Sequence, residues 1–349
     1  MSVQLPTGAG VTRQMATGGL SQPAGVPGHS AAPVKESRRR FRVTGNGAAY
    51  ASSADIRARA MGYYFVFPAL ALFGLFIAYP LVRSVMISLT QWPGFGPSKF
   101  VGFANFSAMF SDPVFSTAFF NTIYFTVATT ILQTAVPLVL AALLNARVRF
   151  GAVYRVAIFL PALMSLVVSG ALWALIYEPK FGIVDSFLDS IGLHALAFAW
   201  ISNSATVVPA LIVVSLWQSA GFFTLIFYAA LQDVDQSLYE AASIDGASAV
   251  GQFFHVTVPM VRTVTSVVVT LNLINGLKIF DIIYVMTGGG PDHASESLST
   301  YLYSLAFGGQ VAGAVPAVGY ATAIGVVILA FAVLVVIVQQ FLASRRRVL

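Results

Sequence analysis

Residues 239–259, YEAASIDGASAVGQFFHVTVP, decide the fold, because they form a polar interruption between two long apolar segments. Their pattern predicts two short helices, over residues 236–245 and 247–258. We expect these helices to meet at Gly246, because glycine adopts the left-handed backbone conformation without steric cost. Pro259 is expected to end the second helix, since its ring does not fit a helix interior. The stretch therefore predicts a docking element at a membrane surface.

The predicted docking element offers small and acidic side chains to a partner. Alanines such as Ala241 let another backbone approach closely, and the carboxylates of Glu240 and Asp245 accept hydrogen bonds. These two carboxylates are five residues apart, so they diverge by about 140° around a helix and are not expected to form a catalytic pair. The candidate coupling residues are Tyr239, Glu240, Ala241, Ala242, Asp245, Gly246, Ala247, Phe253 and Pro259.

The composition indicates a membrane protein. Of the 349 residues, 57% are hydrophobic and 9% are charged, against roughly 25% charged residues in a soluble domain. The chain has no cysteine, which excludes disulfides and cysteine-based metal or thiolate chemistry, and its four histidines form no ligand cluster. No metal site is therefore expected. No nucleic-acid partner is expected either, because the net charge of +6 is explained by membrane topology.

Six apolar segments predict an all-α membrane protein with six transmembrane helices. Each is close to the roughly 20 residues that a helix needs to cross the hydrocarbon core. Helices are required because lipid offers no partners to backbone polar groups. Pro137 is expected to kink the second of these helices. The predicted spans are residues 63–82, 118–144, 153–176, 207–231, 260–280 and 317–341.

Residues 1–60 differ in composition from the rest of the chain. They are rich in Gly, Ser, Ala and Pro, contain a cluster of arginines and lack apolar periodicity, which predicts a disordered basic tail. The arginines are expected to attract anionic lipid, with binding of a specific protein as the alternative. The predicted domains are this cytoplasmic tail and a six-helix transmembrane domain over residues 61–349, which contains the coupling loop 232–259.

The positions of the basic residues predict the orientation. Lys and Arg concentrate in the tail, in residues 145–155 and at the C-terminal end, whereas the alternate loops contain few. Because positive residues mark cytoplasmic loops, both termini and the coupling loop are predicted to be cytoplasmic. The docking element would then face the compartment that holds ATP.

The chain has no nucleotide-binding motif of its own. A P-loop reads G-x-x-x-x-G-K-[ST], and none of the four lysines is followed by Ser or Thr. The protein is therefore predicted not to be an enzyme. If ATP and Mg²⁺ drive it, another chain must bind them, and residues 239–259 are expected to receive the movement of that chain.

Two motifs resemble those of a known family. The order EAA (240–242), Gly246 and VTVP (256–259) resembles the EAA loop of permease subunits in bacterial ATP-binding cassette (ABC) importers. Residues 280–291, FDIIYVMTGGGP, resemble the FD-x-x-Y-x-L-T-x-G-G-P segment of the sugar importers, although the Gly-Pro run is also an ordinary tight turn. Thr263 departs from the pattern, because it stands where the family often has a proline.

The resemblance implies a permease subunit of a carbohydrate importer in a bacterial inner membrane. It implies four kinds of partner: a second homologous permease, an ATP-binding cassette ATPase dimer, an extracytoplasmic sugar-binding protein and membrane lipid. The ATPase would bind ATP and Mg²⁺, and the substrate would be an oligosaccharide or a polyol-type compound. The alternative is a secondary transporter driven by an ion gradient. That class expects charged residues at mid-membrane, and the centres of the predicted spans hold none.

Polar and aromatic side chains within the predicted spans are the candidates for substrate contact. Asn272 and Asn275 are three residues apart and are expected on one helical face, with bonding to another helix as the alternative. For Trp173 and Tyr177 the alternative is an aromatic belt at the membrane interface. The full set of candidates is Asn272, Asn275, Trp217, Gln218, Trp173 and Tyr177.

Overall fold

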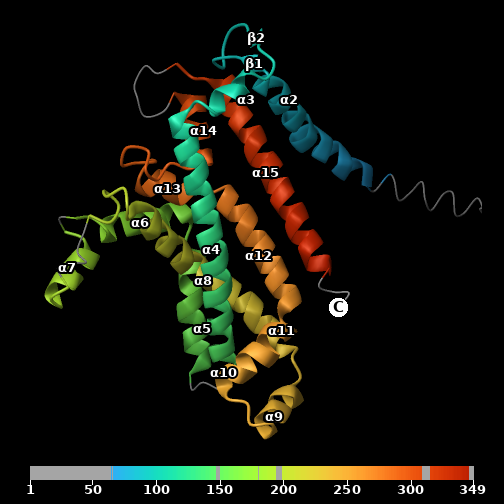
Figure 1. Ribbon diagram of the computed structural model, residues 1–349, viewed down its shortest axis with the longest axis vertical. Helices are drawn as coiled ribbons and strands as arrows, with labels where there is room; N and C mark the ends of the chain where they lie inside the picture. Colours follow the sequence, from blue (N-terminus) through green and yellow to red (C-terminus); the bar gives the residue numbers. More distant parts are fainter. Residues whose placement is uncertain are drawn as a thin grey trace, which may run out of the picture. The chain divides into compact units, whose positions relative to one another are not determined.

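The computed structural model describes residues 64, 66–146, 150–179, 181–193, 199–308 and 315–345, and Tyr63–Leu349 form one compact unit. The predicted tail over residues 1–60 lies outside the described residues. Within the described part, the unit consists of helices, their connecting loops and one two-stranded hairpin (Figure 1).

Three helices form the centre of this unit: α4 (Pro113–Asn145), α8 (Val207–Gln232) and α12 (Arg262–Leu277). α4 contacts both of the others (Figure 1). Buried apolar side chains hold the three together, among them Phe227 and Leu231 of α8 and Val268 of α12. Pro137 is buried inside α4, which continues through it as one assigned helix. The expected kink at this proline stays a prediction.

The number of membrane-spanning helices is four, or up to six, by length and composition. The four single candidates are Val66–Ser88, Pro113–Asn145, Val207–Gln232 and Val318–Phe341. Two further pairs of helices pass the same test only together, and each pair is sharply bent. The prediction of one uninterrupted helix over residues 153–176 is therefore wrong, whereas the helix predicted over residues 260–280 corresponds to α12 (Arg262–Leu277), which starts just after its break. Each break has a local cause.

The first bent pair has its break at residues 164–165. α5 (Gly151–Phe159) continues into a 3₁₀ turn, η2 (Leu160–Leu163), and α6 (Leu166–Ile176) leaves at 98° to them. Pro161 lies in the 3₁₀ turn, and Met164 and Ser165 have extended backbones. The Ser165 side chain accepts a hydrogen bond from the Val168 N–H, which caps a new helix and stabilises the break.

The second bent pair has its break at Val261. α10 (Ala249–Gln252), the π-turn η4 (Phe253–Thr257) and α11 (Val258–Met260) form one stretch, and α12 leaves it at 74°. The prediction that the helix ends against Pro259 is wrong, because Pro259 lies within α11. In the π-turn the Val258 N–H bonds to the Phe253 carbonyl. This i→i−5 bond shifts the hydrogen-bonding pattern of the helix directly before Pro259, which has no backbone N–H to donate.

A π-turn also precedes a proline in the first candidate span. The π-turn η1 (Gly74–Ala78) precedes α2 (Tyr79–Ser88), whose second residue is Pro80. The Tyr79 N–H bonds to the Gly74 carbonyl, again five residues back. A π-turn therefore precedes a helical proline at two separate places in the chain.

The opposite ends of the unit have different structures (Figure 1). One end has α9 (Gln236–Ile244) and α10. The other end has the antiparallel hairpin of β1 (Thr90–Gln91) and β2 (Lys99–Phe100), together with α3 (Ala104–Met109) and α14 (Leu298–Phe307). The remaining helices are α7 (Ile183–Ser190), α13 (Asp281–Met286) and α15 (Val318–Arg345).

Candidate functional site

The docking element starts with a capped helix. The Asp235 carboxylate accepts a hydrogen bond of 2.9 Å from the Ser237 N–H at the start of α9. This bond holds the pKa of Asp235 below its usual range, because it favours the charged form. Asp235 therefore stays ionised at neutral pH and keeps the first turn of α9 capped.

A left-handed residue separates the two helices of the element, as the sequence predicted. Gly246 has a φ of 80°, and the Ala247 N–H bonds to the Ala242 carbonyl across it. The second helix begins two residues later than predicted, at Ala249, because Ser248 accepts a hydrogen bond from the Gly251 N–H. Ala247 therefore belongs to the connection and not to a helix.

One side of the element points outward. Glu240, Ala241, Asp245 and Gly246 are exposed, as is Pro259. Large apolar side chains stand among them, which the sequence reasoning missed. Ile244 is 87% exposed, Val250 66% and Phe254 61%.

Ile244 directly precedes Asp245, so a large exposed apolar side chain stands next to a carboxylate, as a partner-binding surface requires. The available signal was the position of Ile244 in SIDG, an apolar side chain within an otherwise polar segment. The arrangement suits a partner that offers an apolar depression with amide or basic groups around it.

The other side of the element points inward and touches this chain itself. The Tyr239 hydroxyl lies 3.1 Å from the Thr257 hydroxyl. The Gln252 side-chain amide donates to Ser243 Oγ at 2.9 Å. Phe253 packs against the buried core between α4, α8 and α12. Tyr239 and Phe253, which the sequence analysis listed among the candidate coupling residues, therefore contact this chain itself, whereas Glu240 and Asp245 are exposed.

The two asparagines of the fifth predicted span also separate. Asn272 is 1% exposed and its amide nitrogen lies 3.5 Å from Thr134 Oγ1 on α4, a long contact. Asn275 is exposed. The pair is not one joint site, because Asn272 lies inside the contact between α12 and α4 whereas Asn275 is exposed.

The aromatic candidates do come together. The Trp173 ring lies 5.4 Å from the Trp217 ring and 5.3 Å from the Tyr177 ring, measured between centroids. Trp200 extends this aromatic cluster, because its ring lies 6.2 Å from that of Tyr177. The sequence reasoning missed Trp200, since it lies outside the predicted spans. Gln218 follows Trp217, and its amide lies 3.4 Å from the Met164 carbonyl at the break before α6.

The turn after α13 is fixed by hydrogen bonds to α4. The Asn121 amide donates to the Ala294 and Glu296 carbonyls at 2.9 Å and 3.1 Å. The Leu298 N–H donates to Thr122 Oγ1 at 2.9 Å. Glu296 is 4% exposed and lies 2.9 Å from the exposed His293 ring. The Asn121-Thr122 pair thus has a structural role, because it attaches this loop to α4.

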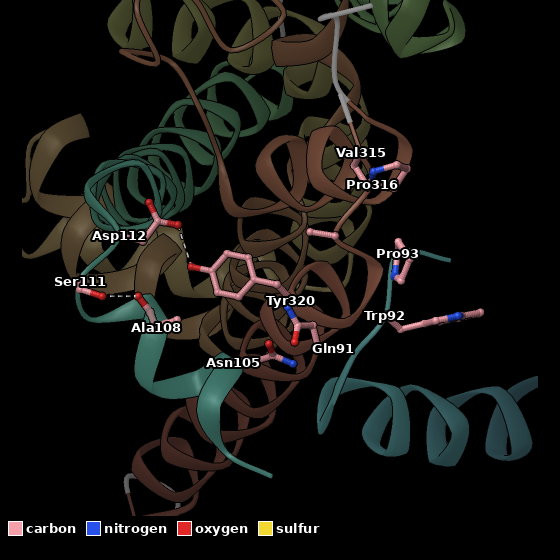
Figure 2. A pocket seen from close by; sticks show the side chains of 11 residues that line it. Gln91, Trp92, Pro93, Asn105, Ala108, Ser111, Asp112, Val315, Pro316 and Tyr320 are labelled. Atoms are coloured by element: carbon pink, nitrogen blue, oxygen red, sulfur yellow. Dashed lines mark hydrogen bonds between the residues drawn. The ribbon is translucent and has the colours of Figure 1, made fainter. Parts of the chain in front are cut away.

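A cavity of about 730 Å³ is lined by residues of β1, α3 and α15, among them Gln91, Asn105 and Tyr320 (Figure 2). Asp112, the N-cap of α4, lies in its wall, and its carboxylate accepts hydrogen bonds of 2.7 Å from both Tyr301 and Tyr320. Burial raises the pKa of Asp112, but these bonds and two backbone N–H bonds lower it by more, so the pKa lies below its usual range. Its acceptor positions are filled by the chain itself, which makes Asp112 a structural residue.

Among the described residues, no group of three His, Cys, Asp or Glu could hold a metal ion.

Comparisons with known proteins agree with this architecture. Residues 101–348 match the family model described as "Binding-protein-dependent transport system inner membrane component". The chain is 38% identical over 270 residues to the probable ABC transporter permease protein YurN of Bacillus subtilis, which covers 76% of this chain and 90% of that protein. It is 34% identical over 289 residues to the lactose transport system permease protein LacF of Rhizobium radiobacter, with 82% and 94% covered. It is 35% identical over 274 residues to the arabinooligosaccharides transport system permease protein AraP of Bacillus subtilis, with 78% and 84% covered.

A solved structure shares the fold. The chain matches a subunit in the crystal structure of a bacterial ABC transporter involved in the import of the acidic polysaccharide alginate, with a TM-score of 0.72. The match covers 84% of this chain and 98% of that chain at 23% sequence identity. At this identity the likeness concerns the fold alone.

Proposed function

Because the chain belongs to the family of binding-protein-dependent transport system inner membrane components, we propose that it is one permease subunit of an ATP-driven sugar importer. It lines part of the path of the sugar through a bacterial inner membrane, and it receives the movement of a separate ATPase through α9 and α10. The sequence supports the separate ATPase, because the chain contains no P-loop.

The observation that carries the coupling role is the exposed Ile244, which lies between Glu240 and Asp245 in the EAA sequence. A side chain of this size is stabilised by about 1.5–3 kcal/mol when it is fully buried, so a partner that covers it gains binding energy. In this proposal the partner is an ATPase dimer that binds ATP and Mg²⁺, and α9 lies in the cytoplasm.

The substrate is proposed to be an oligosaccharide. Support comes from the relatives, because LacF is named for lactose and AraP for arabinooligosaccharides. Support also comes from the aromatic cluster around Trp173 and Trp217, since flat indole rings can stack on sugar rings. Gln218 beside them adds an amide for sugar hydroxyls. Asn275 remains a candidate for the sugar path, whereas Asn272 is assigned to the contact between α4 and α12.

The importer needs two further partners. The span Val66–Ser88 has none of its most apolar window buried in this chain, so we propose that a second homologous permease and lipid cover it. An extracytoplasmic sugar-binding protein is proposed to deliver the sugar at the end of the unit that contains α14. One of the solved importers that share the fold contains a periplasmic protein bound to an alginate pentasaccharide.

Purification in mild detergent from the native cells tests this proposal. The expected result is a complex in which this chain is accompanied by an ATPase and a second permease of similar size. A chain that purifies alone and accumulates sugar in vesicles under an ion gradient, without ATP, would instead establish the secondary transporter.

A further inference from the structure

We propose that two side-chain hydrogen bonds inside the chain, Tyr239 to Thr257 and Gln252 to Ser243, brace α9 against α10 and η4. The braced elements then move as one lever and turn the start of α12. This inference rests on the proposed coupling role of α9. It adds that the lever is held together by this chain and not by the ATPase.

The first reason is that α9 is weakly attached. None of its residues is buried, and its main contacts with other elements are to α10 and η4. Only residues 233–235 join it to α8 along the backbone. A push on the exposed side of α9 would therefore bend this joint unless side chains hold α9 to the next helix.

The second reason is the geometry of the two bonds. Tyr239 and Ser243 are four residues apart on α9, so they lie on the same face one turn apart. Their partners Thr257 and Gln252 lie five residues apart on the following stretch. Two bonds at separate points prevent rotation, whereas one bond would act as a pivot. Ser243 also donates to the Tyr239 carbonyl at 2.9 Å, which fixes its hydroxyl as the acceptor for Gln252.

The third reason is where the brace ends. Thr257 is 4% exposed and is the last residue of η4. Val261, the residue at the 74° corner, is 2% exposed and packs in the core with Phe227 and Val268. A displacement of Thr257 therefore acts on a corner that is packed into the centre of the bundle, and α12 starts at the next residue.

The bond between Tyr239 and Thr257 also satisfies a buried hydroxyl group, that of Thr257. Thr257 would leave a polar group without a partner if the Tyr239 hydroxyl were removed. The brace therefore makes a specific prediction: Tyr239→Phe and Thr257→Val each break the same bond, and the double variant is no worse than either single variant.

The test uses the complete importer in lipid vesicles, with sugar uptake and ATP hydrolysis measured together. We expect Tyr239→Phe, Thr257→Val and Ser243→Ala each to lower the sugar transported per ATP by about five-fold, the effect of one hydrogen bond. The complex should assemble normally. Tyr154→Phe is the matched control, because Tyr154 is an exposed tyrosine on α5. An unchanged transport-to-ATP ratio, or loss of the ATPase from the complex, would overturn the brace.

A distance measurement tests the lever directly. The chain has no cysteine, so spin labels can be attached through Gln236→Cys on α9 and Thr263→Cys on α12, both exposed positions, in an importer freed of other reactive cysteines. We expect a narrow distance distribution that Ser243→Ala broadens and Tyr154→Phe leaves unchanged. Equal widths in all variants would contradict the brace, even where ATP-driven uptake by the unaltered importer upholds the proposed function.

Discussion

Gly276 on α12 lies directly against Thr126 on α4: a Cβ at position 276 would stand 2.8 Å from the Thr126 Cα. The two backbones meet there without a side chain between them. This contact fixes the distance between α4 and α12, and Asn272 lies one turn away in the same contact.

Replacing this glycine should therefore destabilise the bundle. We expect Gly276→Val to lower the free energy of unfolding by about 1–3 kcal/mol, because an added side chain would push α12 away from α4. Thermal unfolding of the purified complex in detergent measures the effect. Gly151→Val is the control, since a Cβ there would meet no atom within 4 Å. Equal losses in both variants would show that the contact is not close.

Asp112 should stabilise the end of the bundle in a way that depends on pH. Its pKa is lowered in the folded chain, so its contribution is complete above the unfolded pKa of about 3.9 and is lost as the pH falls below about 4. We expect Asp112→Asn to lower the melting temperature at pH 7 and to differ less from the unaltered protein near pH 3. A difference that is constant with pH would assign the loss to something other than the carboxylate.

The exposed Ile244 should matter for the partner and not for the fold. We expect Ile244→Asp to weaken binding of the ATPase by about ten-fold or more, since truncation or reversal of a central apolar contact has effects of this size. Ile183→Asp on α7 is a matched control, because Ile183 is 69% exposed on another helix. Affinity of the detergent-solubilised chain for the ATPase measures both. Equal effects of the two substitutions would remove Ile244 from the docking surface.

The aromatic cluster and Asn272 should behave differently toward sugar. We expect Trp217→Leu to lower the apparent affinity for the transported sugar by about three- to ten-fold, as stacking contributes roughly 0.5–1.5 kcal/mol. Asn272→Leu should leave sugar affinity unchanged, because Asn272 faces α4. Sugar-stimulated ATP hydrolysis by the importer, measured over a range of sugar concentrations, separates the two. If Asn272→Leu lowered the sugar affinity and Trp217→Leu did not, the sugar would instead bind at α12.

The parts of the fold that depend on local chemistry could be predicted from the sequence. The fourth predicted span, residues 207–231, agrees with α8 at Val207–Gln232, because a long apolar run between polar residues has few alternatives. Gly246 has the expected left-handed backbone. Both features depend on a few neighbouring residues.

The parts that depend on packing could not be predicted. The break at Ser165 lies within an apolar run, so hydropathy does not change where the direction of the chain does. The break at Val261 lies two residues after the predicted helix end at Pro259. The π-turn before Pro259 moves the expected helix end, since a shift in hydrogen bonding can absorb a proline. The separation of Tyr239 from Glu240 depends on Thr257, which lies 18 residues away. The contact between Tyr239 and Thr257 has no local sequence signal.

ATP-driven uptake tests the central claim most directly. The chain would be reconstituted in sealed vesicles with the ATPase and the second permease that accompany it, and uptake of a labelled oligosaccharide would be followed in the presence of the sugar-binding protein. We predict accumulation that requires ATP on the side of α9, that Ile244→Asp lowers, and that persists when ion gradients are collapsed. Accumulation by this chain alone under an ion gradient, without ATP, would contradict the proposed function.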